Sequence, residues 1–505
     1  MNPFQSIQVR KPKTNKFDLS HERKMSVNFG NLYPMLLEEI IPGDNFKVKS
    51  EIFIRLAPLL SPVMHRINVY SHYFFVPNRL VWSEWEDFIT GGEDGTANPT
   101  FPTTTINQPY WTRFQQGTLA DYFGLPITEA GMTGGIDTDI SLIPFRAYQL
   151  IYNEYYRDQN LVTKVPITKN SGNVAQTTTE GLETVTLRER AWEKDYLTSC
   201  LPWAQRGGAA AAPLDVTPTY LDTSLAYQSD GTQTTGDITT NSGQVLVNNS
   251  AGRIENLGEF SGEVLINDLR KATRLQEWLE KQARGGSRYI ETILSHFGVR
   301  SSNKALQRPQ YLGGSSQPVT ISEVLQTAEG TNPVAEMYGH GISVGGGHGF
   351  KRSFEEHGYI IGILSITPKT AYQNGLARTW RKFDKFDYYW PEFAHLGEQE
   401  VTQSEAYYTW KDTSDLTTTF GYQQRYAEYK YKESIVSGDF RTNLAFWHLG
   451  RIFTEKPFLN ETFITCRPRY DVFSVIDETV DHFYVQIYHK ISALRPIPYF
   501  SIPTL

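Results

Sequence analysis

Few residues have the types and spacing that could do chemistry, and their context argues against a catalytic centre. Gly341-Ile342-Ser343-Val344-Gly345 matches the G-x-S-x-G pattern of a serine nucleophile on a tight strand-to-helix turn. That mechanism needs a helix directly after the serine, whereas Gly345-Gly346-Gly347 follows here and disfavours one. We therefore interpret this segment as a flexible glycine loop. No Gly-Lys-Ser/Thr sequence follows a glycine-rich segment, so the phosphate-binding loop of nucleotide hydrolases is missing.

Patterns for metal binding and paired carboxylates are equally weak. The 11 histidines are scattered, and His340 and His348 share a glycine-rich stretch without a third ligand. Glu38-Glu39 and Glu355-Glu356 are adjacent pairs, so the two side chains of each pair tend to point in different directions. Paired-carboxylate glycosidase chemistry stays open, but nothing in the sequence favours it. We expect no catalytic residue, no bound metal and no cofactor.

Two passages instead combine aromatic and basic side chains at high density: FGYQQRYAEYKYKES at 420–434 and WRKFDKFDYYWPEF at 380–393. Three interpretations are open: plain packing in a core or at a sheet edge, stacking on unpaired nucleic-acid bases, and contact between subunits. We favour the subunit contact, because Tyr, Trp and Arg dominate the energetics of protein interfaces. The candidate interface residues are Tyr422, Arg425, Tyr426, Tyr429, Tyr431, Trp380, Tyr388, Tyr389 and Trp390.

The composition fits a folded protein with broad contact surfaces. The chain has 505 residues, of which 39% are hydrophobic, 20% charged and 13% aromatic, so wholesale disorder is excluded. The formal net charge of -7 is unlike that of most proteins that bind DNA through their whole surface. Any contact with nucleic acid must therefore be local.

Residues 1–24 are the natural place for such a contact, because six basic and two acidic residues give them a net charge of +4. One interpretation is a solvated, poorly ordered tail. The other is a basic N-terminal arm that touches DNA phosphates without reading sequence. The candidate interior DNA contacts are Arg10, Lys11, Lys13, Lys16, Arg23 and Lys24.

The cysteine content and the apolar segments bear on the compartment. Cys200 and Cys466 are the only cysteines, which rules out a disulfide framework and fits folding in a reducing cytoplasm. The N-terminal segment lacks the apolar core of a signal peptide. The longest apolar stretch, near Tyr359–Ile366, is too short to span a bilayer, so we expect no membrane insertion.

Strand-like segments lie near both ends of the chain. Residues 46–56 alternate between apolar and charged side chains, and 66–76 and 483–491 alternate similarly, whereas 359–367 is a continuous apolar run typical of a central strand. Helices are expected at 80–89, at 264–284 and from Ser287 to Phe297, where the last buries Ile290, Ile293, Leu294 and Phe297. Strands and helices do not alternate regularly, so a β-sandwich with very long loop insertions is favoured over a parallel α/β fold.

Residues 207–262 differ from the rest in being rich in Gly, Ser, Thr and Asn. We interpret them as an exposed insertion that carries small β elements of its own. The remainder, residues 25–505, is expected to form a single domain around this insertion.

Several long motifs, in order, resemble the major capsid proteins of gokushovirus-type Microviridae, which are small tailless phages with circular single-stranded DNA. The motifs cover most of the chain from about Phe17 onward, and residues 1–16 and 207–262 depart from the family pattern. They are LSHERKMSVNFGNLYPMLLEEIIPGD, YLTSCLPWAQRGG, ARGGSRYIETILSHFGV, RPQYLGG, FDYYWPEFAHLGEQ and FGYQQRYAEYKYK.

The resemblance implies an all-β core, an eight-stranded antiparallel jelly roll, with long inter-strand loop insertions that contain helices and short strands. It further implies a non-enzymatic subunit of an icosahedral T=1 shell around circular ssDNA, located in the virion and assembled in the bacterial host cytoplasm. Implied partners are other copies of the chain, a small basic DNA-packaging protein, a minor spike or pilot protein and a host surface receptor. By position alone, 207–262 would project near the threefold axes for host attachment, with candidates Tyr220, Asp222, Tyr227, Asp230, Asn241 and Asn248.

A second class of function stays open from the residues alone. A jelly-roll protein that binds or hydrolyses glycans would also use exposed aromatics, to stack against sugar rings. The signal-free, cysteine-poor sequence weighs against that alternative.

Overall fold

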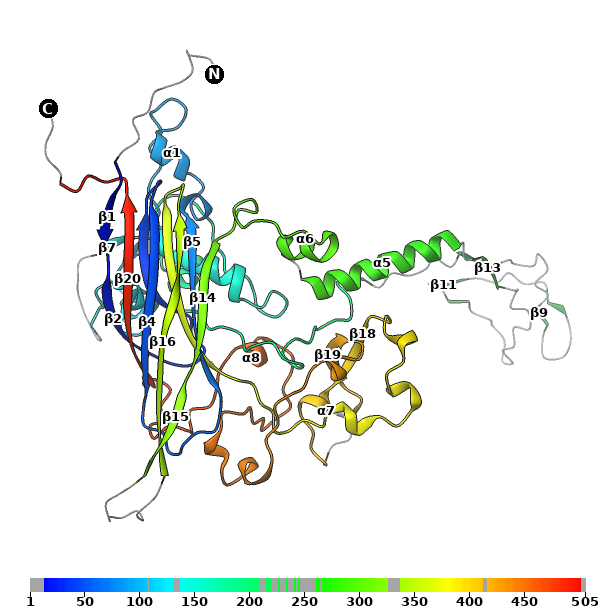
Figure 1. Cartoon of the computed structure of the whole chain (residues 1–505). Helices are drawn as coiled ribbons and strands as arrows, with labels where there is room; N and C mark the ends of the chain where they lie inside the picture. The colour runs from blue at the N-terminus through cyan, green and yellow to red at the C-terminus, as the bar shows by residue number, and fades with distance from the viewer. Residues whose placement is uncertain are drawn as a thin grey trace. The chain divides into compact units, whose positions relative to one another are not determined.

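A computed structural model describes residues 13–107, 109–129, 137–208, 266–286, 288–325, 337–411 and 416–500, together with the backbone of six short strands between 215 and 263. The chain forms two compact units, one of residues 205–284 and the other of residues 1–204 and 285–505. The larger unit contains two antiparallel sheets that pack into a β-sandwich, with further small sheets and helices (Figure 1).

The first sheet has six strands, and neighbouring strands in it are antiparallel. Both β1 and β2 pair with β20 along the same edge, and β15 forms the opposite edge. In spatial order its strands are β1 (Asn15–Asp18) with β2 (His21–Val27), β20 (Phe483–Arg495), β4 (Asn45–Leu56), β16 (Met337–Ser353) and β15 (Thr320–Leu325).

The second sheet has four antiparallel strands: β14 (Gln310–Pro318), β5 (Ile67–Pro77), β17 (Gly358–Pro368) and β3 (Tyr33–Ile40). The strands predicted at 46–56, 66–76, 359–367 and 483–491 are confirmed as β4, β5, β17 and β20. In β4 and β20 buried and exposed side chains alternate, as expected for strands with one face on the core and one in solvent.

The continuous apolar run of β17 has a different cause. Ile360 and Leu364 point into the core between the two sheets, whereas Ile361 and Ile363 point into a second core on the other face of the sheet. That second core contains Phe145 and other apolar residues of α3 (Ile143–Ile151). Because β17 is covered on both faces, every second residue need not be polar.

A polar network crosses the core between the two sheets. The Tyr73 hydroxyl donates to Ser50 Oγ at 2.6 Å, and Ser50 Oγ lies 2.7 Å from His489 Nδ1. His489 Nε2 lies 2.9 Å from the carbonyl oxygen of Met35. Burial lowers the pKa of His489 to about 4, so the imidazole is neutral at pH 7 and its two ring nitrogens can accept and donate in this chain.

Three strands between 310 and 353 were not predicted, and the glycine-loop interpretation of 341–347 is wrong. These residues lie within β16, where Gly339 and Gly341 face closely packed neighbours. A Cβ at Gly341 would lie 2.7 Å from a Leu56 methyl group, and one at Gly339 would lie 2.2 Å from the Ser61 carbonyl oxygen. At Gly339 and Gly341 glycine therefore serves close approach within the sheet. Gly347, with a φ of 96° and open space around it, lies instead at a register shift between β16 and β4.

The helices confirm part of the expectation. The segment 80–89 forms a 3-10 turn at Asn78–Leu80 and a short helix, α1 (Trp85–Thr90), while 264–284 corresponds to α5 (Ile266–Gly285). The third expected helix is α6 (Tyr289–Phe297), which ends at Gly298 with φ of 69°. The expectation that α6 is buried is wrong, because Leu294 and Phe297 are exposed. The remaining described α-helices are α2 (Leu119–Phe123), α4 (Thr179–Val185), α7 (Gln403–Ala406) and α8 (Glu461–Ile464).

The smaller unit is described as α5 and three short strand pairs. These are β8 (Asp215–Pro218) with β13 (Phe260–Glu263), β9 (Ala226–Tyr227) with β10 (Gln233–Thr234), and β11 (Thr240–Asn241) with β12 (Gln244–Val245). The larger unit has two further pairs, β6 (Thr103–Ile106) with β7 (Thr138–Ser141), and β18 (Glu398–Thr402) with β19 (Thr419–Gln424).

Candidate protein–protein interface

Large aromatic side chains are exposed in the segments around the β18–β19 pair. They lie before β18, between the two strands and after β19. Trp380, Phe383 and Trp410 retain 75%, 88% and 86% of their accessible area in the single chain. Several large exposed aromatic side chains in neighbouring segments of one region are typical of a site of interaction. We call it the aromatic surface, and its members are Trp380, Phe383, Phe386, Tyr388, Tyr389, Trp390, Trp410, Tyr429 and Tyr431.

A small hydrophobic core lies beneath this surface. Val401 of β18, Phe420 of β19 and Ala406 of α7 pack in it with residues from distant parts of the chain, including Tyr196 and Phe463. The Tyr196 hydroxyl donates to Glu405 Oε2 at 2.7 Å, which adds a buried polar contact to the packing. The aromatic surface is therefore attached to a packed support.

Short 3-10 turns set the exposed aromatics in place. Asp387 Oδ2 accepts hydrogen bonds from the backbone N–H groups of Phe383 and Asp384, each at 2.9 Å, and these bonds lower the pKa of Asp387. This caps the turn Lys385–Asp387. Pro391 then begins the next turn, Pro391–Phe393, where its fixed φ favours a helical start. With the backbone hydrogen bonds satisfied locally, the aromatic side chains are left pointing outward.

The two aromatic-basic passages, about 40 positions apart in sequence, meet in space. The Tyr389 ring lies 5.0 Å from the Tyr426 ring and 6.4 Å from the Tyr429 ring, both edge to face. The Trp390 backbone N–H donates to the Tyr426 hydroxyl at 3.2 Å, and the Tyr426 N–H donates to Gln399 Oε1 at 3.1 Å. Tyr426 has a φ of 62°, a strained conformation for a tyrosine that these surrounding contacts hold in place.

A buried ion pair joins the same two passages. Lys382 Nζ lies 3.2 Å from Glu428 Oε1 and 3.8 Å from the centre of the Tyr429 ring. Both charged side chains are nearly inaccessible to solvent. Burial alone would raise the pKa of Glu428, but a hydrogen bond from Gln399 and the Lys382 ammonium hold it below its ordinary value. The ion pair therefore fixes Tyr429 against the 380–393 passage before any partner binds.

The candidate interface residues divide into two groups in the single chain. Trp380, Tyr388, Tyr389, Trp390, Tyr429 and Tyr431 are exposed and belong to the aromatic surface. Tyr426 is only 3% exposed, and Tyr422 and Arg425 are half-buried, so these three support the surface from below. Residues 427–429 form a short 3-10 turn, and no strand runs through 429–432.

Sequence reasoning did not single out Phe383, Phe386 and Trp410. The first two lie inside the quoted 380–393 passage and could have been chosen by the same criterion. Trp410 stands outside both passages, and nothing in its neighbourhood distinguishes an exposed tryptophan from a buried one.

Part of the basic N-terminal segment is paired in the first sheet. Residues 15–18 and 21–27 form β1 and β2, so only the stretch before Asn15 can be an arm. Lys13, Lys16 and Lys24 are exposed, whereas the Arg23 guanidinium donates to the Tyr122 carbonyl oxygen and burial lowers its pKa. Arg10 and Lys11 lie outside the described residues.

The host-attachment candidates are barely covered. Tyr227 lies on β9 and Asn241 on β11, with only their backbone described, whereas Tyr220, Asp222, Asp230 and Asn248 lie outside the described residues.

The residues considered for chemistry have structural roles. Ser343 is buried within β16, donates to the Pro318 carbonyl oxygen at 2.8 Å and accepts from Gln317 Nε2 at 2.8 Å. Glu355 and Glu356 pair separately, with Lys304 and Arg79. No group of three His, Cys, Asp or Glu side chains in the described parts of the chain could hold a metal ion. Among the described helices none combines the length and apolarity needed to cross a membrane.

Comparison with known proteins gives a consistent result. Residues 5–505 match the family described as capsid protein (F protein). The chain is 35% identical to capsid protein VP1 of Chlamydia phage 1 over 588 aligned residues, covering 100% of this chain and 98% of the relative. It is 35% identical to capsid protein VP1 of Bdellovibrio phage phiMH2K, with 89% of this chain and 87% of the relative covered. For capsid protein VP1 of Spiroplasma virus 4 the identity is 27%, with 97% and 95% covered.

Proposed function

Because the chain belongs to the capsid protein (F protein) family, we propose that its copies form a closed icosahedral T=1 shell around a circular single-stranded DNA genome. The protein is a structural capsid subunit of the Microviridae type and not an enzyme, which replaces the glycan-binding alternative. Its place is therefore in the virion. The shell symmetry, the further partners and the site of assembly belong to the proposal.

We propose that the β-sandwich is an eight-stranded jelly roll with long insertions. If β1 and β2 count as one strand and β15 as an extension of the edge, eight strands remain. We number these eight strands along the chain, so that β1/β2 is the first and β20 the eighth. Across one sheet the strands β1/β2, β20, β4 and β16 are then the first, eighth, third and sixth. Across the other sheet β3, β17, β5 and β14 are the second, seventh, fourth and fifth. That order supports the proposal, because it is the one that two interleaved Greek keys produce.

The observation that carries the proposed assembly is the aromatic surface. A shell subunit must match several neighbours at once, so it should carry rigid apolar surface that is exposed only while the chain is alone. The aromatic surface supports this role: its rings are exposed, and the Lys382–Glu428 pair holds Tyr429 against the 380–393 passage. Contact between copies removes those rings from water, which is the main driving force for association.

The contact with DNA is proposed to be local and independent of sequence. The exposed lysines of the 13–24 segment support it, since phosphate contacts need cations but no base readout. The overall charge of -7 leaves most of the neutralisation of the genome to another molecule, which we propose is a small basic DNA-packaging protein. A minor spike or pilot protein completes the particle in this proposal.

Residues 207–262 are proposed to project outward near the threefold axes and to bind a host surface receptor. They fall within a compact unit of the chain, residues 205–284. We also propose assembly in the bacterial host cytoplasm, which the two buried cysteines support, because neither takes part in a disulfide. Replacing 207–262 by a short Gly-Ser linker should leave particle formation intact and abolish adsorption to host cells. Failure of that variant to form particles would contradict the outer attachment role.

The proposed assembly is tested by producing the chain alone and examining it by sedimentation and electron microscopy. We expect closed particles of one diameter, which protect single-stranded DNA from nuclease when it is present. A chain that stays monomeric across salt, pH and protein concentration would overturn the proposal.

A further inference from the structure

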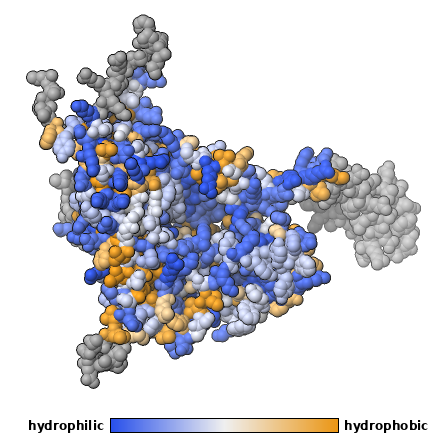
Figure 2. All heavy atoms as spheres, in the orientation of Figure 1, coloured by the Kyte–Doolittle hydropathy of each residue, from blue (hydrophilic) through white to orange (hydrophobic). Residues whose placement is uncertain are grey.

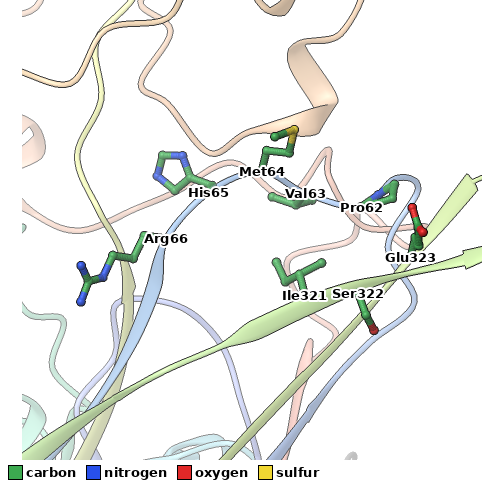
Figure 3. A pocket seen from close by; sticks show the side chains of 8 residues that line it. All are labelled: Pro62, Val63, Met64, His65, Arg66, Ile321, Ser322 and Glu323. Atoms are coloured by element: carbon green, nitrogen blue, oxygen red, sulfur yellow. The ribbon is translucent and has the colours of Figure 1, made fainter.

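An apolar groove lies at one end of the first sheet, remote from the aromatic surface in sequence. Figure 3 shows its lining, in which Val63 and Ile321 lie between Glu323 at one end and Arg66 at the other. The groove has a volume of 670 Å³ and is formed by residues 62–66, which connect β4 to β5, and by residues 321–323 of β15. This volume is in the range of sites that take up a few large side chains.

The groove continues into a wider exposed apolar area. Figure 2 shows apolar residues gathered over the end of the sheet where β15 lies. The exposed members are Leu60, Met64, Val324, Leu325 and Met337. β15 also forms the open edge of its sheet, an arrangement that proteins protect or use for association.

At the opposite end of the same sheet an apolar segment follows β20. Ile497, Tyr499 and Phe500 are exposed, although the segment itself is held in place. Asn15 Nδ2 donates to the Ile497 carbonyl oxygen at 2.8 Å, and the Phe17 ring stacks on the Tyr499 ring with centres 5.9 Å apart. The segment is therefore presented in a defined position with much of its aromatic surface uncovered.

The groove cannot take up this segment from its own chain. Leu56, where β4 ends on the groove side, pairs with Phe483, whereas Asn45 pairs with Leu494 beside the C-terminal segment. The two ends are thus separated by the length of β20, roughly 40 Å at about 3.4 Å per residue. The five residues after Arg495 reach at most about 18 Å. Figure 1 shows β15 at the lower end of the strands and the C-terminal segment at their upper end.

We propose that residues 496–500 of one copy insert their apolar side chains into the 62–66/321–323 groove of a neighbouring copy. This rests on the proposed function, and it specifies one contact of the shell and its two unlike partner surfaces. The two surfaces are different and lie at opposite ends of the sheet, so the contact is heterologous. Repetition of this contact closes a ring of copies when the rotation that relates one copy to the next is a whole fraction of 360°.

Charge and backbone chemistry favour this occupant. Glu323 on the groove rim forms no ion pair with any residue that the structure describes, and the exposed Lys13 lies two residues before Asn15, which holds the C-terminal segment. The groove's own basic side chains are engaged: Arg66 Nε donates to Asn68, and His65, whose pKa burial lowers, has Nε2 2.6 Å from the Lys369 carbonyl oxygen. Lys13 then faces the neighbour's Glu323, and the genome contact falls to the other lysines.

The prolines of the segment define how it binds. Pro496 and Pro498 have no N–H group, so the segment cannot extend the β15 edge as a regular strand. An extended proline-rich segment instead places its side chains into an apolar groove, with little conformational entropy to lose. The contact is therefore an insertion of Tyr499 and Phe500, and not an extra strand of the sheet.

Disulfide trapping in assembled particles tests the proposal. The Met64→Cys/Phe500→Cys chain, oxidised in particles, should lose its monomer band and give a ladder of dimers, trimers and larger species. Each single-cysteine variant should stay monomeric, because position 64 of one copy meets position 500 of another. Dimers alone would indicate a contact with twofold symmetry and would overturn the proposal, as would cross-linking in a single variant. Particles without any cross-link would overturn this contact but leave the capsid role intact, whereas chains that form no particles would overturn both.

Charge reversal gives a second, independent measurement. Lys13→Glu and Glu323→Lys should each lower the yield of particles at least tenfold, because like charges then face each other across the contact. The double variant should recover most of the yield. Lys49→Glu, on the exposed face of β4 and away from both surfaces, is the matched control and should assemble normally. Equal losses in the single and double variants would contradict the pairing of Lys13 with Glu323.

Discussion

Truncating Phe383 should separate the assembly of this protein from its folding. The side chain is 88% exposed in the single chain, so Phe383→Ser removes almost no packing within the subunit. We expect its free energy of unfolding to change by no more than about 0.5 kcal/mol, as for other surface substitutions. A contact between copies, by contrast, would lose the whole ring.

The size of the effect on assembly follows from the area of the ring. An aromatic side chain buries about 150–250 Å², and at about 25 cal/mol per Å² complete burial is worth about 4–6 kcal/mol for each contact. Imperfect burial reduces this to about 2–3 kcal/mol, which is typical of an interface hot spot. At about 1.4 kcal/mol per factor of ten, the dissociation constant of the contact should rise roughly 30- to 150-fold.

The assay is the lowest protein concentration at which particles form, followed by light scattering and checked by sedimentation. Phe383→Leu keeps most of the apolar area and should shift this concentration much less than Phe383→Ser. Phe458→Ser removes another exposed phenylalanine outside the aromatic surface, and it tests whether any exposed ring has the same effect. If Phe383→Ser assembles like the unchanged chain, the aromatic surface is not a contact between copies.

Four further outcomes are expected. Burial, with Asp195 and Glu405 nearby, raises the pKa of Glu433 to about 8, so between about pH 4.5 and pH 8 the folded state holds a proton that the unfolded state has released. The free energy of unfolding should therefore fall by up to about 1.4 kcal/mol per pH unit over this range. Urea unfolding of Glu433→Gln, measured across the same range, should show a weaker dependence on pH. The pH dependence due to His489 has the opposite sign, because its pKa of about 4 in the folded state lies below the ordinary value of 6.5. The free energy of unfolding should fall as the pH drops from 6.5 towards 4. Acid unfolding of His489→Gln should lack this decrease. Lys382→Met leaves Glu428 as an unpaired buried charge and should lower the free energy of unfolding in urea by about 3 kcal/mol. Adding Glu428→Gln to the same chain should restore most of this loss. Equal stability of the single and double variants would contradict the role of the ion pair. Ser343→Ala removes a buried hydroxyl with two partners and should cost about 1 kcal/mol of unfolding free energy while the particle yield stays unchanged.

The sequence alone determined the features that depend on local periodicity. The alternation in β4 and β20 follows from one face on a core and the other in solvent, and the helix α6 ends where glycine permits a positive φ. The absence of a helix after Ser343 was also correctly inferred from its glycines. The role of the glycines before Ser343 was not inferred, because flexibility and close approach have the same signature in sequence, and only the neighbouring Leu56 and Ser61 reveal the close approach at Gly341 and Gly339.

The tertiary structure decided which aromatic residues are available to a partner. Tyr426 and Tyr429 stand three positions apart in one passage, yet the first is buried and the second exposed, because a chain turn at Tyr426 and the distant Gln399 and Trp390 enclose only one of them. Pairing of 380–393 with 420–434 through Lys382 and Glu428 is likewise a property of the fold. The type of a side chain determines which contacts it can make. Whether the side chain is buried depends on segments that are far away in the chain, and a single sequence does not show which of these segments come close in space.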